Sequence, residues 1–189
     1  TKKDAASARK FFRLKPDVTT LLVTGGSLGA KTINETIEKS RPLLSAAGIQ
    51  VLHIVGGSSD LAEVSEPEFR RIRYVDKMEL AIAASDFAVS RAGASTVSEF
   101  SAVGLPALYI PYAVGNGEQK FNLLDVLASG GAISVTDKEF DEQYVRQTLI
   151  PVISDSKRLL KMAEAARKAG VLDGTERFVA MVEEVVSRR

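Results

Sequence analysis

Cysteine is absent from this chain of 189 residues. Its absence excludes disulfides, thiolate metal sites and cysteine nucleophiles, and it is compatible with a reducing compartment. An excess of charge of one sign is also missing, because 25 lysines and arginines stand against 24 acidic residues and leave a net charge of +1. Such a surface has no overall field to gather polyanions, so nucleic acid is not expected as a partner.

Long hydrophobic runs are missing too, although hydrophobic residues make up 45% of the chain. The longest run, Leu105 to Val114, covers about ten residues and contains two prolines, whereas a membrane-spanning helix needs about 20. The amino terminus is basic but lacks the apolar segment of a secretory signal. We expect residues 1–18 to form a surface helix and a connection, followed by one domain, residues 19–189.

What the sequence does contain is an alternation of short β-rich runs and helical stretches. Runs such as LLVT and ALYI are apolar almost throughout, which is typical of parallel strands that helices cover on both faces. The pattern predicts an α/β fold with a doubly wound, parallel, six-stranded Rossmann-like sheet. The predicted strands lie in TTLLVTGG, IQVLHIVGG, RIRYVD, DFAVSR, PALYIPY and GAISV.

Four features of the helices are also predicted. A short helix is expected between the second and third strands, and Pro42 is expected to split the first long helix. Two closing helices are expected over residues 141–169 and 175–188. In the last of these, apolar residues recur at helical spacing, which favours packing against the core over contact with a membrane surface.

Glycine-rich loops follow most of the predicted strands, and in open parallel sheets ligands bind beyond the carboxyl ends of the strands. The first of these loops contains Gly25, Gly26 and Ser27 and leads into a helix. Glycine lets the backbone approach a ligand closely, and the free N–H groups of a helix start attract an anion. This loop therefore predicts phosphate binding.

Three other interpretations compete for the same loop. It is also compatible with a tight turn that needs glycine only for its backbone angles. A P-loop would have a glycine where Ala30 stands, and Asp76 provides the only acidic strand end for an ATPase. A dinucleotide site would have an acidic residue near the end of the second strand, which LHIVGG lacks.

A second glycine-rich helix start consists of Gly93, Ala94, Ser95 and Thr96, and Glu99 follows one turn later. Two such helix starts at one sheet edge could hold a pyrophosphate with backbone donors alone. Glu99 is either the capping-box partner of Thr96 or the acceptor for both hydroxyls of a ribose. Both interpretations remain open at this point.

A polar loop, Gly115 to Gln119, precedes another predicted helix. The side chains of Glu118 and Gln119 suit the hydroxyls of a sugar, and equally suit a polar helix cap. His53 lies in the apolar run VLHIV without an identifiable acidic partner, so we expect a buried structural histidine and not a general base. Asp86 and Arg91 flank the fourth strand and are expected to be structural charges.

Four motifs together resemble the carboxyl-terminal, donor-binding domain of the MurG family. They are TGGSLGA, YVDKM, SRAGASTVSEFSAVGLPALYIPY and GNGEQKFN, in this order, and the resemblance runs from about Leu21 to the end of the chain. The family consists of bacterial N-acetylglucosaminyltransferases that convert lipid I to lipid II in peptidoglycan synthesis. The resemblance implies one half of a GT-B glycosyltransferase, in which two Rossmann-like domains face a cleft.

The resemblance implies a role for each motif in holding UDP-GlcNAc. The loop of Gly25, Gly26 and Ser27 would lie near the donor phosphates, and the backbone of Val75 would pair with the uracil edge. The helix start Gly93–Thr96 would hold the phosphate nearer the ribose.

The remaining contacts concern the two sugars of the donor. By the same resemblance, Glu99 would take the ribose hydroxyls, while Glu118 and Gln119 would take the GlcNAc hydroxyls. The chain departs from the family where Leu28 replaces a common glutamine and where Glu118 occupies a position that often holds a glutamine.

The resemblance further implies an inverting transfer of GlcNAc to a lipid-linked acceptor, with donor recognition supplied by this chain. The acceptor site, the membrane contact and the catalytic base are expected in an amino-terminal domain that this chain lacks, so no catalytic residue is assigned here. No metal or cofactor is expected, because helix-terminus donors can stabilise the departing UDP.

The full-length enzyme is expected at the cytoplasmic face of the bacterial plasma membrane. The alternative is a non-catalytic UDP-sugar-binding subunit that works with a separate membrane-bound chain.

Overall fold

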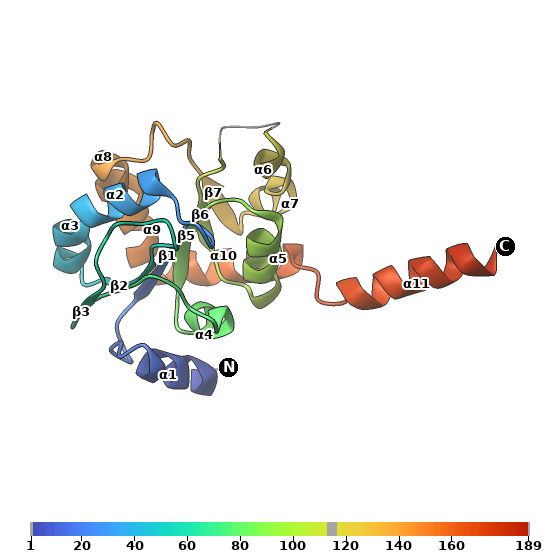
Figure 1. The fold of residues 1–189 in the computed structure, drawn as a ribbon, viewed down its shortest axis with the longest axis horizontal. Helices are drawn as coiled ribbons and strands as arrows, with labels where there is room; N and C mark the ends of the chain where they lie inside the picture. The colour runs from blue at the N-terminus through green and yellow to red at the C-terminus, as the bar shows by residue number, and fades with distance from the viewer. Residues whose placement is uncertain (1, 113–116, 189) are drawn as a thin grey trace.

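The computed structural model describes residues 2–112 and 117–188, in which helices cover both faces of a single sheet (Figure 1). The strands are β1 (Thr20–Thr24), β2 (Gln50–Ile54), β3 (Val64–Glu66), β4 (Phe69–Ile72), β5 (Phe87–Ser90), β6 (Ala107–Tyr109) and β7 (Ala132–Ser134). Their order across the sheet is β3-β4-β2-β1-β5-β6-β7.

The predicted doubly wound α/β fold class is confirmed. The six predicted strands correspond to β1, β2 and β4 to β7, and neighbouring strands among these six run parallel. The strand β3 is a seventh that pairs antiparallel with β4 at the edge of the sheet. It lies where a short helix was predicted, so that prediction is wrong: pairing with β4 outweighs the helix preference of the sequence LAEVSE.

Side chains of the central strands alternate between two cores, one on each face of the sheet. Leu22 and Ala88 belong to the first core, whereas Leu21 and Phe87 belong to the second. The first core is covered by α1 (Lys2–Phe11), α4 (Met78–Ala83), α5 (Ala94–Val103) and α7 (Leu124–Ala128). The second is covered by α2 (Lys31–Lys39), α3 (Arg41–Ala46), α8 (Glu142–Tyr144), the π-helical segment η1 (Val145–Leu149) and α9 (Ile150–Ser154).

The predicted interruption of the first long helix is confirmed. The helix α2 ends at Lys39 and α3 begins at Arg41, with Pro42 in the first turn of α3. Proline is tolerated at that position because its missing N–H would have no partner inside the helix.

The helix α1 is tied to the sheet by polar contacts. Arg9 donates to the backbone oxygen of Ala84 at 3.0 Å and pairs with the carboxylate of Asp86 at 2.7 Å. The same carboxylate oxygen accepts from the backbone N–H of Thr20 at 2.8 Å. Asp86 is therefore a structural charge, as predicted, that joins α1 to the starts of β1 and β5. The division of the chain at residue 18 stays a prediction.

The first closing helix is less regular than predicted. The run α8, η1 and α9 ends at Ser154, and α10 (Ser156–Ala169) begins after Asp155, whose side chain accepts from the backbone N–H of Arg158 at 3.0 Å. Asp155 is the N-cap of α10, and a residue that caps a new helix start does not continue the preceding helix. The chain therefore turns within the segment predicted as a single helix.

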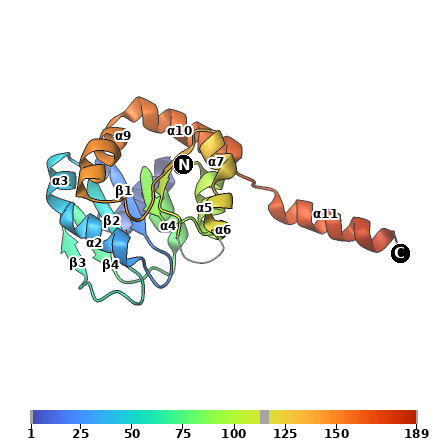
Figure 2. The same ribbon diagram turned by 90° about the horizontal axis from the view of Figure 1, so that it is seen from above.

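The prediction that the last helix packs on the core is wrong. The helix α11 (Gly174–Ser187) extends away from the sheet and its covering helices (Figures 1 and 2), and none of its residues is buried. Its apolar side chains include Phe178 at 61% exposure and Val186 at 66%. Helical spacing shows that one face is apolar but does not say what covers it. In the described ranges no helix combines the length and apolar character that crossing a bilayer requires.

The exposure of α11 leads to a stability prediction. Ending the chain after Asp173 should change the free energy of unfolding by less than about 0.5 kcal/mol, because no buried contact is lost. The measurement is urea denaturation of the shortened and complete chains. As a control, Phe100→Ala in the first core should lower stability by about 3 to 5 kcal/mol. A comparable loss on shortening would mean that α11 packs against the domain after all.

Candidate functional site

The strands β1 and β5 are neighbours at the point in the sheet where the strand order reverses direction. They run parallel with Thr24 opposite Ser90, so the loops that follow them leave the same edge from strands about 4.8 Å apart. The helices that follow, α2 and α5, pack on opposite faces of the sheet. Their amino termini nevertheless begin at the same edge, which is where ligands bind in this class of fold.

The loop between β1 and α2 is shaped by glycine. A Cβ on Gly25 would lie 2.3 Å from the backbone nitrogen of Ala30, and Gly26 has a φ of 87°. The N-cap residue of α2, Ala30, provides no side-chain cap. Among the described residues, the backbone amides of Ser27 and Leu28 have no acceptor. The loop therefore combines a tight turn with free N–H donors at a helix start.

The loop between β5 and α5 presents a second helix start without a side-chain cap. The N-cap residue is Gly93, with a φ of −65°, and α5 begins at Ala94. Thr96 is thus the third residue of the helix and not its N-cap, so the capping box with Glu99 does not form. Ser95 and Glu99 are exposed, one turn apart on α5. The carboxylate of Glu99 is available to a ligand.

Val75 lies farther along the same edge. It follows β4, which is separated from β1 by β2 alone, and its side chain packs against the first core. The structure therefore places Val75 at the same edge of the sheet as the two glycine-rich loops, two strands from β1 and three from β5. The contact with uracil stays a prediction.

Gln119 holds together the ends of two strands. Its side-chain Oε1 accepts from the backbone N–H of Tyr112 at 2.9 Å and of Ala92 at 3.2 Å. Asn122 completes the arrangement by donating to the backbone oxygen of Ala92 at 2.9 Å. Because both partners of Gln119 are N–H donors, the shared atom must be the amide oxygen. Only the Nε2 group of Gln119 remains for a ligand.

Glu118 is the first residue of α6 (Glu118–Phe121), directly beside Gln119. Its side chain is exposed and carries only acceptor atoms when ionised. The start of α6 thus carries a donor on Gln119 and an acceptor on Glu118. Gly115 and Asn116, which belong to the same predicted loop, lie outside the described residues.

Arg91 is a structural charge, as predicted. It pairs with the carboxylate of Asp137 at 2.7 Å and donates to the backbone oxygen of Ile110 at 3.1 Å. Its guanidinium also lies 5.4 Å from the centre of the Tyr112 ring. These contacts fix the chain directly after β5 and β6, next to the residues that Gln119 holds.

His53 is a buried structural residue, as predicted. It lies in β2 with no exposed surface, and its Nε2 is 2.9 Å from Oδ1 of Asn34. Burial, together with the nearby positive charge of Arg71, lowers the pKa of His53 to about 3. A histidine that stays neutral and has no route to solvent cannot serve as a general base.

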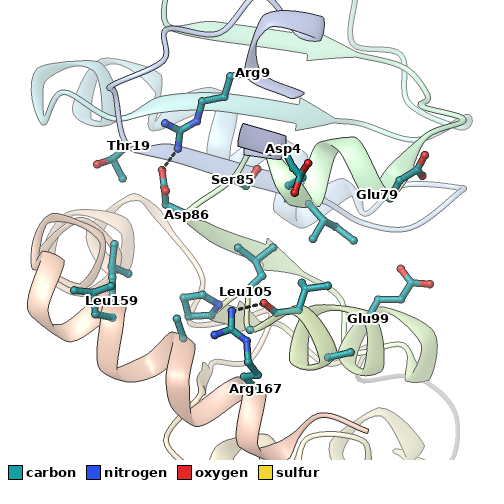
Figure 3. A pocket seen from close by; sticks show the side chains of 18 of the residues that line it. Asp4, Arg9, Thr19, Glu79, Ser85, Asp86, Glu99, Leu105, Leu159 and Arg167 are labelled. Carbon is teal, nitrogen blue, oxygen red and sulfur yellow. Dashed lines mark hydrogen bonds and ion pairs between the residues drawn. The ribbon is translucent and has the colours of Figure 1, made fainter. Parts of the chain in front are cut away.

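A cavity of about 1130 Å³ lies between α1, α4, α5 and α10 (Figure 3). It is lined by Thr19, Asp86 and Pro106, which directly precede β1, β5 and β6, so most of it lies at the amino ends of the strands. Of the predicted site residues only Glu99 lines it, at the end away from the Arg9–Asp86 pair. The cavity is therefore not the predicted phosphate site.

Sequence reasoning missed the residues that hold the site in place. Asn34 is 4% exposed and donates to the backbone oxygen of Val55 at 2.9 Å. Asn122 and the amide oxygen of Gln119 satisfy backbone groups, as described above. The available signal was Asn34 directly after Ile33 on a face that packs inward, because a polar residue in such a place needs a buried partner.

Comparison with known proteins shows a consistent family. The sequence profile described as the glycosyltransferase family 28 C-terminal domain matches residues 20–178. A protein of Leifsonia xyli subsp. xyli named UDP-N-acetylglucosamine--N-acetylmuramyl-(pentapeptide) pyrophosphoryl-undecaprenol N-acetylglucosamine transferase is 48% identical over 93% of this chain and 49% of its own length. A Streptomyces collinus protein of the same name is 45% identical over 96% of this chain and 51% of its own. The chain thus spans about half the length of these relatives.

Solved structures share the fold. The crystal structure of Acinetobacter baumannii MurG superposes with a TM-score of 0.77 at 23% identity, over 93% of this chain and 53% of that one. The C-terminal CMP-Kdo binding domain of WaaA, from the same organism, gives a TM-score of 0.64 at 11% identity, over 89% of this chain and 96% of that one. At these identities the likeness concerns the fold alone.

The burial of His53 leads to a prediction about pH. Below pH 6.5 the unfolded chain binds a proton that the folded chain does not bind until about pH 3. The free energy of unfolding should therefore fall as the pH drops from 6.5, by up to about 1.4 kcal/mol per pH unit. Above pH 6.5 this contribution is complete.

The measurement is urea denaturation of the wild type and His53→Gln at about pH 7.5 and about pH 4.5, since glutamine does not titrate. The wild type should lose about 2.7 kcal/mol more than the variant over this interval. Equal losses would contradict a neutral, buried His53.

The contacts of Gln119 lead to a second prediction. Gln119→Leu removes the acceptor of two backbone N–H groups and should lower the free energy of unfolding by about 1 to 3 kcal/mol. Gln119→Glu keeps an acceptor oxygen in place and should change it by less than about 0.5 kcal/mol. Thermal unfolding of both variants against the wild type tests this, and equal stability of the two variants would rule out the proposed contact.

Proposed function

Because the chain belongs to the family of glycosyltransferase family 28 C-terminal domains, we propose that it is the donor-binding part of an inverting N-acetylglucosaminyltransferase. Its donor is UDP-GlcNAc, and the complete enzyme transfers GlcNAc to lipid I, giving lipid II for peptidoglycan. The observation that carries the proposal is the pair of uncapped helix starts, α2 and α5, at the ends of adjacent parallel strands. Such a pair supplies backbone donors to a diphosphate without a cluster of basic side chains.

The two helix starts divide the diphosphate between them. In the proposed complex the loop of Gly25, Gly26 and Ser27 holds the phosphate attached to GlcNAc, and α5 holds the one attached to ribose. Gly93 supports this assignment: among the described residues a Cβ there would meet only Thr96 Oγ1, at 3.9 Å, and its φ is ordinary. The fold does not require glycine at this position, whereas a phosphate close to the backbone does.

The nucleoside and the sugar lie on either side of the diphosphate. Glu99, which has no capping role, accepts both ribose hydroxyls, and the backbone of Val75 pairs with uracil. Nε2 of Gln119 donates to a GlcNAc hydroxyl, since its oxygen is occupied by Ala92 and Tyr112. Glu118 accepts from a neighbouring hydroxyl, a role that a carboxylate performs with more acceptor capacity than the amide common in the family.

The chemistry of this half concerns the leaving group. Attack by the acceptor hydroxyl on the anomeric carbon breaks the bond to the phosphate oxygen, and the electron pair stays on UDP. Free N–H groups and the helix dipoles at Ser27 and Ser95 stabilise that charge. We assign no base among the described residues of this edge, because Glu99 is assigned to the ribose, Glu118 to a GlcNAc hydroxyl, and His53 is buried and neutral.

The remaining steps are assigned to the rest of a longer protein. Relatives named as transferases are about twice as long as the part that matches. We place the lipid-linked acceptor, the membrane contact and the catalytic base in that additional domain, and the full-length enzyme at the cytoplasmic face of the plasma membrane. The same lengths favour this arrangement over a separate UDP-sugar-binding subunit.

Calorimetric titration with UDP-GlcNAc, UDP and ATP tests donor binding directly. Uridine ligands should bind and ATP should not, and Glu99→Ala should weaken UDP binding by about 1 to 3 kcal/mol through loss of the ribose contact. The matched control is Lys31→Ala, because the Lys31 side chain is 88% exposed at the start of α2 and should not affect UDP. Preference for ATP, or loss of binding in the Lys31 variant, would instead support a P-loop.

A further inference from the structure

The loop Gly56–Ser58 follows β2 and is called the second loop. It packs directly against the loop between β1 and α2 that contains Ser27 and Leu28, which is called the phosphate loop. The backbone N–H of Gly57 donates to the oxygen of Ser27 at 2.8 Å, and that of Ser58 donates to the oxygen of Leu28 at 3.2 Å. These two carbonyl groups therefore turn away from the ligand side of the loop, while the amides of the same two residues remain without an acceptor in the described part of the chain. The second loop thus orients the donors of the first.

Two glycines make this contact possible. Gly29 has a φ of 88°, and a Cβ on it would lie 2.0 Å from the backbone oxygen of Val55. Gly56 has a φ of 87°, and a Cβ on it would lie 2.1 Å from the backbone nitrogen of Gly29. Any side chain at either position would separate the loops, because the nearby atoms belong to the backbone and cannot move aside.

Asn34 links the helix that follows the phosphate loop to the start of the second loop. Asn34 lies one turn into α2, the helix that follows the phosphate loop. Its Nδ2 donates to the backbone oxygen of Val55 at 2.9 Å. Its Oδ1 faces Nε2 of His53 at 2.9 Å, so the neutral histidine carries its proton on Nε2 and donates it to Asn34. Nδ1 of His53 has no partner among the described residues. His53 therefore fixes the orientation of the Asn34 amide, and the amide fixes the second loop.

We propose that Asn34, oriented by His53, is a positioning residue for the donor diphosphate. It touches no ligand: it holds the loop Gly56–Ser58 against the phosphate loop, so that the amides of Ser27 and Leu28 point at the phosphate attached to GlcNAc. This inference rests on the proposed function of the phosphate loop. According to this inference, the tighter binding of UDP than of UMP depends on the buried pair Asn34 and His53, although neither side chain touches the ligand.

The test separates the two phosphates by comparing UDP with UMP. In the proposed site UMP reaches only the start of α5, so the ratio of the dissociation constants of UMP and UDP reports the phosphate loop. Asn34→Ala should lower this ratio by about tenfold, the scale of a lost hydrogen bond to a charged group, with little change for UMP. His53→Gln keeps a donor to Asn34 and should preserve the ratio, whereas His53→Leu should lower it.

The matched control lies on the same helix. Thr36→Val removes a buried hydrogen bond from Thr36 Oγ1 to the oxygen of Phe140 at 3.0 Å, at the end of α2 away from the loops. It should reduce thermal stability and leave the ratio unchanged, so a merely structural effect is recognised. Equal ratios in the wild type, Asn34→Ala and His53→Leu would overturn the inference while leaving UDP binding intact.

Two further outcomes are informative. If the wild type itself does not prefer UDP to UMP, the proposed function of the phosphate loop fails, and this inference fails with it. If Asn34→Ala does not fold, Arg73→Ala replaces it, because the exposed Arg73 holds the second loop through the backbone oxygens of Gly57 and Ser59 at 3.3 and 2.9 Å. That variant should lower the ratio by about two- to threefold, as expected for a weaker, exposed contact, and an unchanged ratio would count against the proposal.

Discussion

The parallel pairing of β1 with β5 is the constraint on which the site depends. With Thr24 opposite Ser90, both strands end at the same level, and the chain then turns to opposite faces of the sheet. Two helix amino termini are thereby brought to one edge although the helices pack on opposite faces of the sheet. Each terminus carries N–H groups that its own helix cannot satisfy, and the pairing directs both sets to the same place.

Two uncharged amide side chains, Asn34 and Gln119, hold the chain in place near this edge. Asn34 donates to the backbone oxygen of Val55 and faces Nε2 of His53 with its own oxygen, whereas the oxygen of Gln119 accepts from the backbone N–H groups of Ala92 and Tyr112. An amide can do this at a lower desolvation cost than a charged group would incur. The charged pairs, Arg9 with Asp86 and Arg91 with Asp137, are only partly buried and lie before and after β5. Rigidity at the site therefore comes from hydrogen-bonded amides and closely packed glycines.

Prediction failed where a structure depends on a partner that the local sequence does not reveal. The strand β3 has helix-favouring residues but gains its hydrogen bonds from β4. The apolar face of α11 was expected to join the core, yet its residues are exposed. The helix propensity of the β3 segment and the apolar spacing in α11 are properties of each segment by itself. Neither identifies the element that the segment packs against or pairs with. The strand count and the fate of the last helix were wrong for the same reason.

The amino-acid sequence alone determined the fold class, the six parallel strands, the break at Pro42 and the location of the glycine-rich loops, because each follows from local apolar patterns and backbone preferences. Only the tertiary structure decided that Thr96 does not cap α5, that the oxygen of Gln119 is occupied, and that Gly29 and Gly56 pack back to back. The contacts of Gln119 with Ala92 and of Gly29 with Gly56 join segments that lie apart in the chain. Their hydrogen-bond partners are backbone groups, which every residue carries and which no sequence pattern distinguishes.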